Sequence, residues 1–160
     1  MFNTKEKALA KISSLGLPPI FDRIWSANGP KRFCKQWDRP VRCFEVWCEI
    51  AQKCPQLESC VPLLESNRDQ IVAWDANTNR FIEYHFQDSA CVVIGRTYQQ
   101  LLSSLFVDLG YAGLVDLVEE IADEFEYHHL ESFRKFMESD DNLGAEDAKR
   151  AFVNSVSGEF

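Results

Sequence analysis

Six acidic side chains lie within one short stretch of the sequence, close enough to act together chemically. They are Asp116, Glu119, Glu120, Asp123, Glu124 and Glu126. Carboxylates in such a group could hold a metal ion or share acid and base roles. Between Thr97 and Phe133 the chain has no Lys or Arg, so no cation of that stretch balances them. We interpret the set as a solvated helix face and as a candidate surface for binding a basic protein.

The cysteines form a second group. They are Cys34, Cys43, Cys48, Cys54, Cys60 and Cys91. No two have the tight Cys-x-x-Cys spacing that is common in zinc sites, and the three His residues lie far from the cluster in the sequence. We therefore expect no metal and interpret the cysteines as reduced, small hydrophobic residues of the core. A thiol- or metal-dependent protein built on the Cys34–Cys60 cluster is kept as a separate hypothesis.

Known catalytic motifs are missing from the sequence. It has no glycine-rich phosphate loop, no Gly-x-Ser-x-Gly and no His-Glu-x-x-His. His128 and His129 are adjacent, and on a helix they would point about 100 degrees apart, which suits joint metal binding poorly. His85 and Cys91 would lie on opposite faces of an unbroken strand. We expect neither catalysis nor a cofactor.

Composition and charge restrict the class of protein further. The chain has 160 residues, 46% of them hydrophobic, and a formal net charge of −8, which argues against direct binding of nucleic acid. Residues 1–60 hold 10 Lys and Arg against 6 Asp and Glu, whereas residues 61–160 hold 7 against 19. No apolar run reaches the roughly 18 residues of a membrane span. The charged start, Met1–Lys7, predicts no secretory signal.

The first half of the chain predicts two helices and then strands. Residues 4–15 have apolar side chains at helical spacing after the capping residue Thr4, and a helix within 41–53 should end before Pro55. Residues 20–25 are apolar but show no clear pattern. Strands are expected over the ranges 60–65, 71–75, 80–86 and 91–94, with Ile82, Tyr84 and Phe86 on one face of the third. The polar turn Asp75–Asn79 joins two of them and, with Asp75 and Asn77, is a second candidate for partner binding.

After Gly95 the apolar residues recur at helical spacing. Thr97 and Gln100 form a capping box for a helix that should stop at Gly110. A second helix should carry the acidic set on one face and bury apolar side chains on the other, namely Leu114, Leu117, Val118, Ile121 and Phe125. Two more helices are expected over residues 129–137 and 145–153. The order predicts an α+β fold in one domain, residues 1–160, with an antiparallel sheet meander flanked by N-terminal and C-terminal helices.

Part of the chain resembles the SUKH superfamily. The similar strings are Val61–Asn67, Ile71–Asp75, Arg80–Tyr84, Val93–Gly95, Thr97–Tyr98 and Leu101–Leu102. They follow the family order of an apolar-Pro-apolar strand, a polar turn, a strand ending in Asp, another turn, a strand with a central aromatic residue and a helix. The resemblance covers roughly residues 55–110. The Cys- and Trp-rich segment between Phe33 and Cys60 departs from the usual family start.

The resemblance implies a SUKH-like α+β domain without catalytic residues of its own. Bacterial members of the family are immunity proteins, which bind a secreted toxin inside the producing cell and block it. We therefore expect a cytoplasmic immunity protein, present as a monomer or weak homodimer, whose partner is a cognate toxin such as a nuclease or another enzyme with a basic cleft. Trp25 or Trp37 is a further candidate anchor. The alternative is a regulatory or scaffold module that binds a cellular partner and no toxin.

Overall fold

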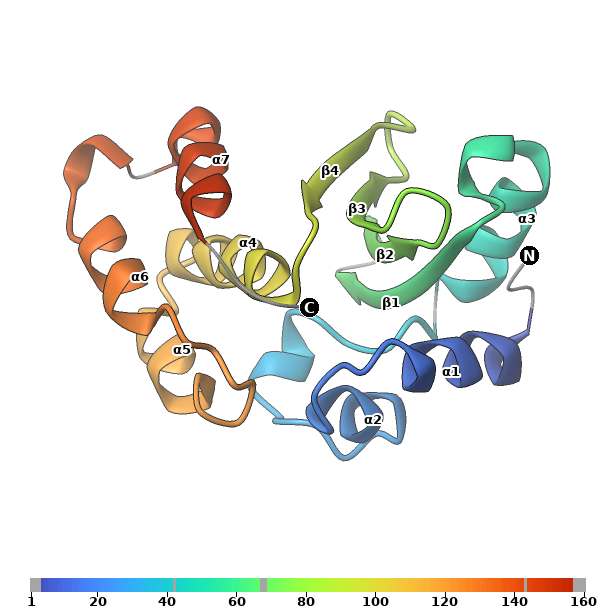
Figure 1. The fold of residues 1–160 in the computed structure, drawn as a ribbon, viewed down its shortest axis with the longest axis horizontal. Coiled ribbons are helices and arrows are strands. Elements are labelled where there is room, and N and C mark those ends of the chain that lie inside the picture. The colour runs from blue at the N-terminus through green and yellow to red at the C-terminus, as the bar shows by residue number, and fades with distance from the viewer. Residues whose placement is uncertain (1–3, 42, 67–68, 143, 157–160) are drawn as a thin grey trace. The chain divides into compact units, whose positions relative to one another are not determined.

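The chain forms helices, then one sheet, then helices again (Figure 1). The computed structural model describes residues 4–41, 43–66, 69–142 and 144–156, so Asn67 of the family resemblance lies outside the described residues. The chain consists of two compact units, Met1–Val93 and Ile94–Phe160. The predicted α+β class with an antiparallel sheet is confirmed. The SUKH likeness and the single domain stay predictions.

Helices occupy the beginning of the first unit. They are α1 (Lys5–Ser14), α2 (Ile20–Trp25), the 3-10 turn η1 (Phe33–Lys35), α3 (Phe44–Lys53) and the 3-10 turn η2 (Pro55–Leu57). The Thr4 hydroxyl accepts a hydrogen bond from the Lys7 N–H at 3.2 Å, which is the cap that the sequence predicts. Helix α3 ends before Pro55, also as predicted. Helix α2 forms over residues 20–25, the apolar stretch for which the sequence shows no clear pattern.

A four-stranded antiparallel meander completes the first unit. Its strands are β1 (Cys60–Ser66), β2 (Gln70–Asp75), β3 (Arg80–His85) and β4 (Cys91–Gly95), in that order across the sheet. The register pairs Trp74 with Phe81 and Asp75 with Arg80, so the turn between β2 and β3 is the predicted hairpin turn. The chain passes into the second unit within β4.

Both faces of β1, β2 and β3 are buried. On one face, Ile82 and Tyr84 join a hydrophobic cluster with Trp47 of α3, and Phe86 packs against the same cluster. The rings of Trp47 and Tyr84 meet edge to face with centroids 5.7 Å apart. Trp74 and Phe81 pack together with centroids 4.7 Å apart, and both are buried. The predicted common face of the β3 residues is thereby confirmed.

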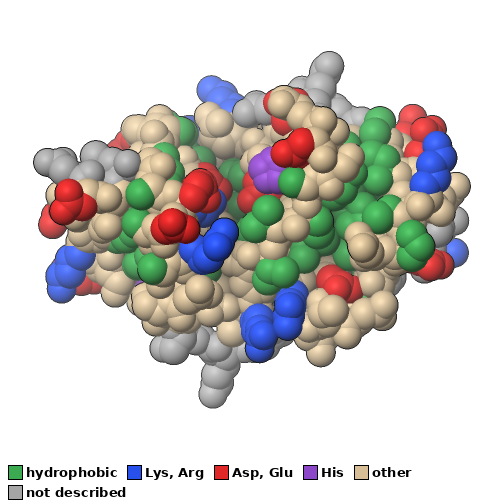
Figure 2. Space-filling view, turned by 90° about the horizontal axis from the view of Figure 1, so that it is seen from above, with side chains coloured by type: hydrophobic (Ala, Val, Ile, Leu, Met, Phe, Trp, Pro, Cys, Tyr) green, Lys and Arg blue, Asp and Glu red, His purple; other side chains and the backbone are tan. Residues whose placement is uncertain are grey.

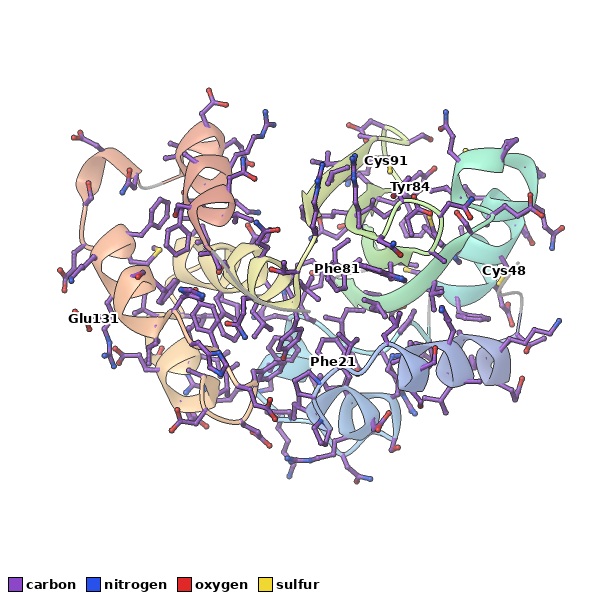
Figure 3. The ribbon with its side chains drawn as sticks, viewed as in Figure 1. Phe21, Cys48, Phe81, Tyr84, Cys91 and Glu131 are labelled. Carbon is purple, nitrogen blue, oxygen red and sulfur yellow. The ribbon has the colours of Figure 1, made fainter. Side chains whose placement is uncertain are left out.

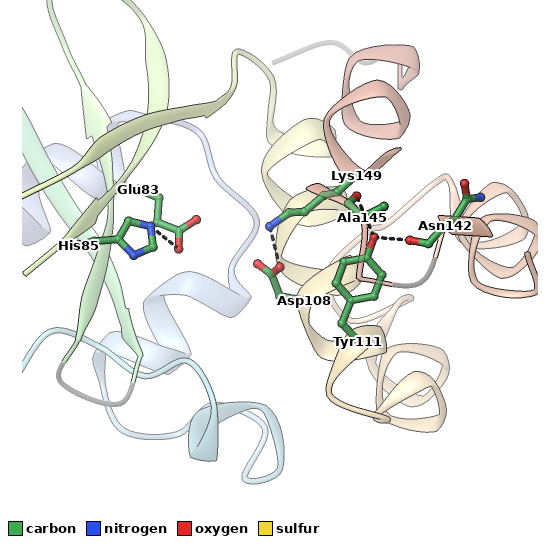
Figure 4. A network of polar contacts seen from close by, with 7 residues as sticks. All are labelled: Glu83, His85, Asp108, Tyr111, Asn142, Ala145 and Lys149. Carbon is green, nitrogen blue, oxygen red and sulfur yellow. Dashed lines mark hydrogen bonds and ion pairs between the residues drawn. The ribbon is translucent and has the colours of Figure 1, made fainter. Parts of the chain in front are cut away.

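The second unit is helical. Its elements are α4 (Tyr98–Tyr111), α5 (Val115–Ile121), α6 (Leu130–Met137), the 3-10 turn η3 (Asp140–Asn142) and α7 (Glu146–Ser155). Lys149 of α7 lies 2.6 Å from the Asp108 carboxylate of α4, and the Tyr111 hydroxyl donates to the Asn142 carbonyl oxygen at 2.7 Å (Figure 4). These contacts fasten the last helix and the turn before it to α4. Among the described residues, no helix has both the length and the apolar character needed to cross a bilayer.

Gly110 lies inside α4, which corrects its predicted role as the end of the helix. A Cβ atom at this position would come within 2.8 Å of both Sδ and Cε of Met137, so the residue allows α6 to approach α4 closely. The left-handed residue after the helix is Gly113, with φ of 76°, and its N–H donates to the Gly110 carbonyl oxygen at 2.9 Å. The helix therefore ends at Tyr111, and the glycine that follows its end is Gly113 and not Gly110.

Candidate partner-binding surface

The acidic segment, Asp116–Glu126, forms one exposed edge of the second unit. Helix α5 buries Leu117, Val118 and Ile121 against the unit and turns its polar side chains outward. All six acidic residues that the sequence singles out are exposed. They are Asp116, Glu119, Glu120, Asp123, Glu124 and Glu126. The structure therefore brings the set together on the surface, where a partner could reach it.

The helix that carries the set is shorter than predicted. It ends at Ile121, so Asp123 and Glu124 lie in the turn that follows and not on the helix face. Glu126 has a left-handed backbone with φ of 53°, which ends this turn. Phe125 is fully buried and anchors the turn from below. The acidic segment is therefore a short helix face joined to a turn.

Buried polar side chains of α4 hold that turn in place. The Tyr98 hydroxyl donates to the Phe125 carbonyl oxygen at 2.7 Å. The Gln99 amide donates through Nε2 to the Glu126 carbonyl oxygen at 2.8 Å, and its Oε1 accepts from the His128 N–H at 3.0 Å. Burial raises the pKa of Tyr98, which keeps the hydroxyl protonated as a donor. The carboxylates are thus presented on a fixed backbone.

Glu119, a member of this set, contacts a cation of the same unit. Nε of Arg134 on α6 lies 2.6 Å from Oε1 of Glu119, and Nη1 of Arg134 lies 3.6 Å from Glu131. Glu131 points away from the unit on α6 (Figure 3) and is also 3.7 Å from Lys135. Glu119 is therefore partly neutralised, which the sequence reasoning did not anticipate.

The second unit keeps a strong negative charge in spite of these contacts. Residues 94–160 contain 5 Lys and Arg against 14 Asp and Glu, a formal charge of −9, whereas residues 1–93 contain 12 against 11, a charge of +1. A cluster of like charges on a surface attracts oppositely charged partners and speeds their association. The described surface of the acidic segment is suited to a basic partner.

The second candidate, the turn Asp75–Asn79, uses its carboxylate internally. Asp75 accepts hydrogen bonds from the Ser59 hydroxyl at 2.6 Å, from the Asn77 N–H at 3.0 Å and from the Thr78 hydroxyl. Burial alone would raise the pKa of Asp75, but these hydrogen bonds outweigh it and the pKa lies below its usual value. Asp75 organises the turn, and Asn77 remains exposed at its tip.

The predicted tryptophan anchors are buried. Trp37 is 3% exposed and Trp25 is 8% exposed, and the Trp25 indole N–H donates to the Leu63 carbonyl oxygen at 2.9 Å. Trp25 lines a cavity of about 240 Å³ together with Lys5, Leu9 and Arg39. A partner would have to enter that cavity to touch the Trp25 ring, and Trp37 is buried without lining it, so the acidic segment is the more accessible candidate.

The cysteines are more varied than predicted. All six lie within the described residues and carry reduced thiols, but only Cys43 and Cys60 are buried and Cys91 is exposed. Burial, with Asp38 nearby, raises the pKa of Cys34 to about 11; burial, with Asp75 nearby, raises that of Cys60 to about 12. Such thiols stay protonated at neutral pH, whereas a nucleophile needs a lowered pKa.

No metal-binding group is found in the described part of the chain: no three His, Cys, Asp or Glu are placed to hold an ion together. Nε2 of His85 lies 3.4 Å from Glu83, its neighbour on β3 (Figure 4). The predicted strand parity between His85 and Cys91 does not apply, because a turn separates β3 from β4. His128 and His129 precede α6 and lie outside any helix, contrary to expectation.

Sequence reasoning missed the residues that position the acidic segment. Gln99 interrupts the apolar stripe of its helix as a buried polar residue, which is a usable signal in retrospect. The pairing of Glu119 with Arg134 joins residues 15 apart in sequence on two helices, and no local pattern reveals it. Comparisons with protein-family models, with curated proteins and with solved structures give no match to this chain.

Proposed function

We propose that this chain is an immunity protein of the SUKH type, which binds a cognate bacterial toxin in the cytoplasm and blocks its active or substrate site. The proposal assigns it no turnover and no cofactor. Its support is the resemblance over residues 55–110 together with one structural observation. That observation is the exposure of six carboxylates on α5 and the turn after it, held by buried side chains of α4.

The blockade follows from simple electrostatics. Many enzymes that act on nucleic acid carry a basic cleft, since their substrate is a chain of phosphates. A rigid row of carboxylates can occupy such a cleft in place of the substrate. Long-range attraction speeds the encounter, and close contacts in the cleft then set how slowly the complex dissociates. Tyr98 and Gln99 already fix the turn that carries Asp123 and Glu124 in the free chain. Binding therefore costs little conformational entropy in this turn.

Co-expression tests the function. The protein encoded next to this chain is produced from an inducible promoter in cells that lack both genes, with and without this chain. We expect the neighbouring protein to kill alone and to be harmless when this chain is present. A neighbour that is not toxic, or that kills equally in both strains, overturns the proposal.

The same strains separate the proposal from its alternative. A regulatory or scaffold module would bind a cellular partner and give no protection against the neighbouring protein. Affinity purification of this chain from its own host, at low and at high salt, identifies the partner. A toxin that is lost at high salt supports the acidic segment as the contact surface.

A further inference from the structure

The large hydrophobic residues that are exposed in the described chain lie in the first unit. They are Leu9, Val41, Val46, Val92 and Val93. In Figure 2, hydrophobic side chains gather on the surface of the part of the chain that holds the sheet and α3. Leu9 and Val41, which are 39% and 43% exposed, line one cavity together. A concave apolar lining that solvent can reach is typical of a ligand site.

The cavity is built from the first unit. Its described lining consists of Lys5, Glu6 and Leu9 of α1, Trp25 at the end of α2 and the segment Arg39–Val41. Trp25 and Pro40 are buried whereas Leu9 and Val41 are exposed, so the apolar lining extends from the interior to the surface. The volume of about 240 Å³ lies below the roughly 300–1,000 Å³ of sites for drug-sized ligands. The cavity therefore suits a small molecule.

Two cations belong to this lining. Nη1 of Arg39 donates to the Trp25 carbonyl oxygen at 2.9 Å, which fixes the guanidinium beside the cavity. A guanidinium has five N–H donors, so this hydrogen bond leaves others for an anion. Lys5 is exposed, and its Nζ lies 6.0 Å from the centroid of the Phe44 ring. Both cations can therefore meet a negatively charged group in the cavity.

Glu6 is the one carboxylate in the described lining, and it is held at the N-terminus of α1. Hydrogen bonds with its own N–H and with Thr4 lower its pKa, and the charge of Lys5 lowers the pKa further. Glu6 is therefore ionised at neutral pH. Two cations and one carboxylate leave the lining with a formal charge of +1. This charge favours an anionic ligand over a neutral or cationic one.

We propose that this cavity binds a small apolar monocarboxylate, a molecule with one carboxylate and a short hydrocarbon body. The carboxylate interacts with Lys5 and Arg39, and the hydrocarbon body packs against Leu9, Trp25 and Val41. The two cations select the anion, and burial of the hydrocarbon body supplies most of the binding free energy. The inference goes beyond the proposed function and does not depend on it, because no residue of the acidic segment takes part.

Titration with hexanoate tests the proposal, with the indole N–H signals in ¹H–¹⁵N NMR spectra as the readout. The Trp25 indole N–H donates to the Leu63 carbonyl oxygen, and a Trp25→Phe variant identifies its signal. We expect this signal to shift saturably, with a dissociation constant of about 1 mM or lower. Acetate lacks the hydrocarbon body and 1-hexanol lacks the charge, so each should bind at least about tenfold more weakly. A Trp25 signal that stays in place, or equal affinities for hexanoate and 1-hexanol, overturns the proposal.

Charge-matched variants locate the carboxylate of the ligand. Lys5→Gln removes a cation from the lining, whereas Lys7→Gln removes one from the same turn of α1 but outside the described lining. We expect Lys5→Gln to weaken hexanoate binding about three- to tenfold and Lys7→Gln to leave it unchanged. Leu9→Glu places a second carboxylate in the lining at an exposed position and should abolish binding in a chain that circular dichroism shows to be folded. Equal affinities of the two lysine variants, or undiminished binding by Leu9→Glu, contradict the proposal.

Discussion

Arg134 donates a hydrogen bond through Nε to Oε1 of Glu119 at 2.6 Å, and this contact joins α6 to the acidic segment. The pair is exposed on both sides, with 42% of each side chain accessible. Exposed pairs contribute little to stability because water and salt screen them. The consequence for function is larger: Arg134 places a positive charge beside carboxylates that are proposed to meet a basic partner.

Replacement of Arg134 should therefore strengthen the electrostatic attraction of the acidic segment. We expect Arg134→Gln to raise the association rate with the toxin roughly twofold at low ionic strength, with little change in the unfolding midpoint. Stopped-flow kinetics at two salt concentrations measure the rate. The matched control is Arg150→Gln, which removes an exposed cation from α7 of the same unit. Equal rates for the two variants would show that the position of Arg134 is unimportant.

Gln99 should be required to hold the acidic turn. Gln99→Met removes the donor to the Glu126 carbonyl oxygen and the acceptor for the His128 N–H, from a residue that is only 5% exposed. We expect the free energy of unfolding to fall by about 1–3 kcal/mol, as measured by urea denaturation. Gln87→Met, at an exposed position in the turn after β3, should change it little. A Gln99→Met protein as stable as the original chain would refute this role.

Asp75 should make the stability of the first unit depend on pH. Its pKa is lower in the folded chain than the usual value near 4 of an unfolded chain, so folding favours the ionised carboxylate. This stabilisation is complete above the unfolded pKa and is lost as the pH falls through the lowered folded pKa. We expect Asp75→Asn to cost about 1 kcal/mol at neutral pH. The difference from the original chain should shrink below about pH 4, and a difference independent of pH would contradict the assignment.

The thiols should react according to burial. At about pH 8, iodoacetamide should modify exposed Cys91 of the native chain well before buried Cys43 and Cys60, whose labelling should need denaturant. Mass spectrometry of tryptic peptides reads the order. Labelling of Cys60 in the native state, or zinc that copurifies in stoichiometric amount and whose removal unfolds the chain, would revive the hypothesis of a thiol- or metal-dependent protein.

Much of the fold follows from local patterns in the sequence. The Asp75–Asn79 turn between two β-rich runs predicts the hairpin correctly, and Thr4 and Thr97 mark the starts of α1 and α4. Helix α2 is not predicted, because a segment of six residues is too short to show helical periodicity. The predicted helix end at Gly110 is wrong because glycine occurs both at helix ends and where two helices pack closely. Only the position of Met137 distinguishes the two roles.

The candidate site is only partly predictable for the same reason. The density of carboxylates and the absence of nearby Lys or Arg mark the acidic segment in the sequence. The end of α5 at Ile121, the bonds from Tyr98 and Gln99, and the contact of Arg134 with Glu119 are tertiary features. These features determine how the carboxylates are presented. They join residues that are far apart in the sequence, so no local sequence pattern predicts them.

The role of the acidic segment in toxin binding is measured by the dissociation constant of the complex between this chain and its toxin. Two variants carry the same change of net charge, from −8 to −5: Glu120→Gln/Asp123→Asn/Glu124→Gln in the acidic segment, and Glu45→Gln/Glu49→Gln/Glu58→Gln at exposed positions of the first unit. We expect the first to bind about 10- to 100-fold more weakly than the original chain, and the second to bind as the original does. Equal affinities for the two variants would contradict the account.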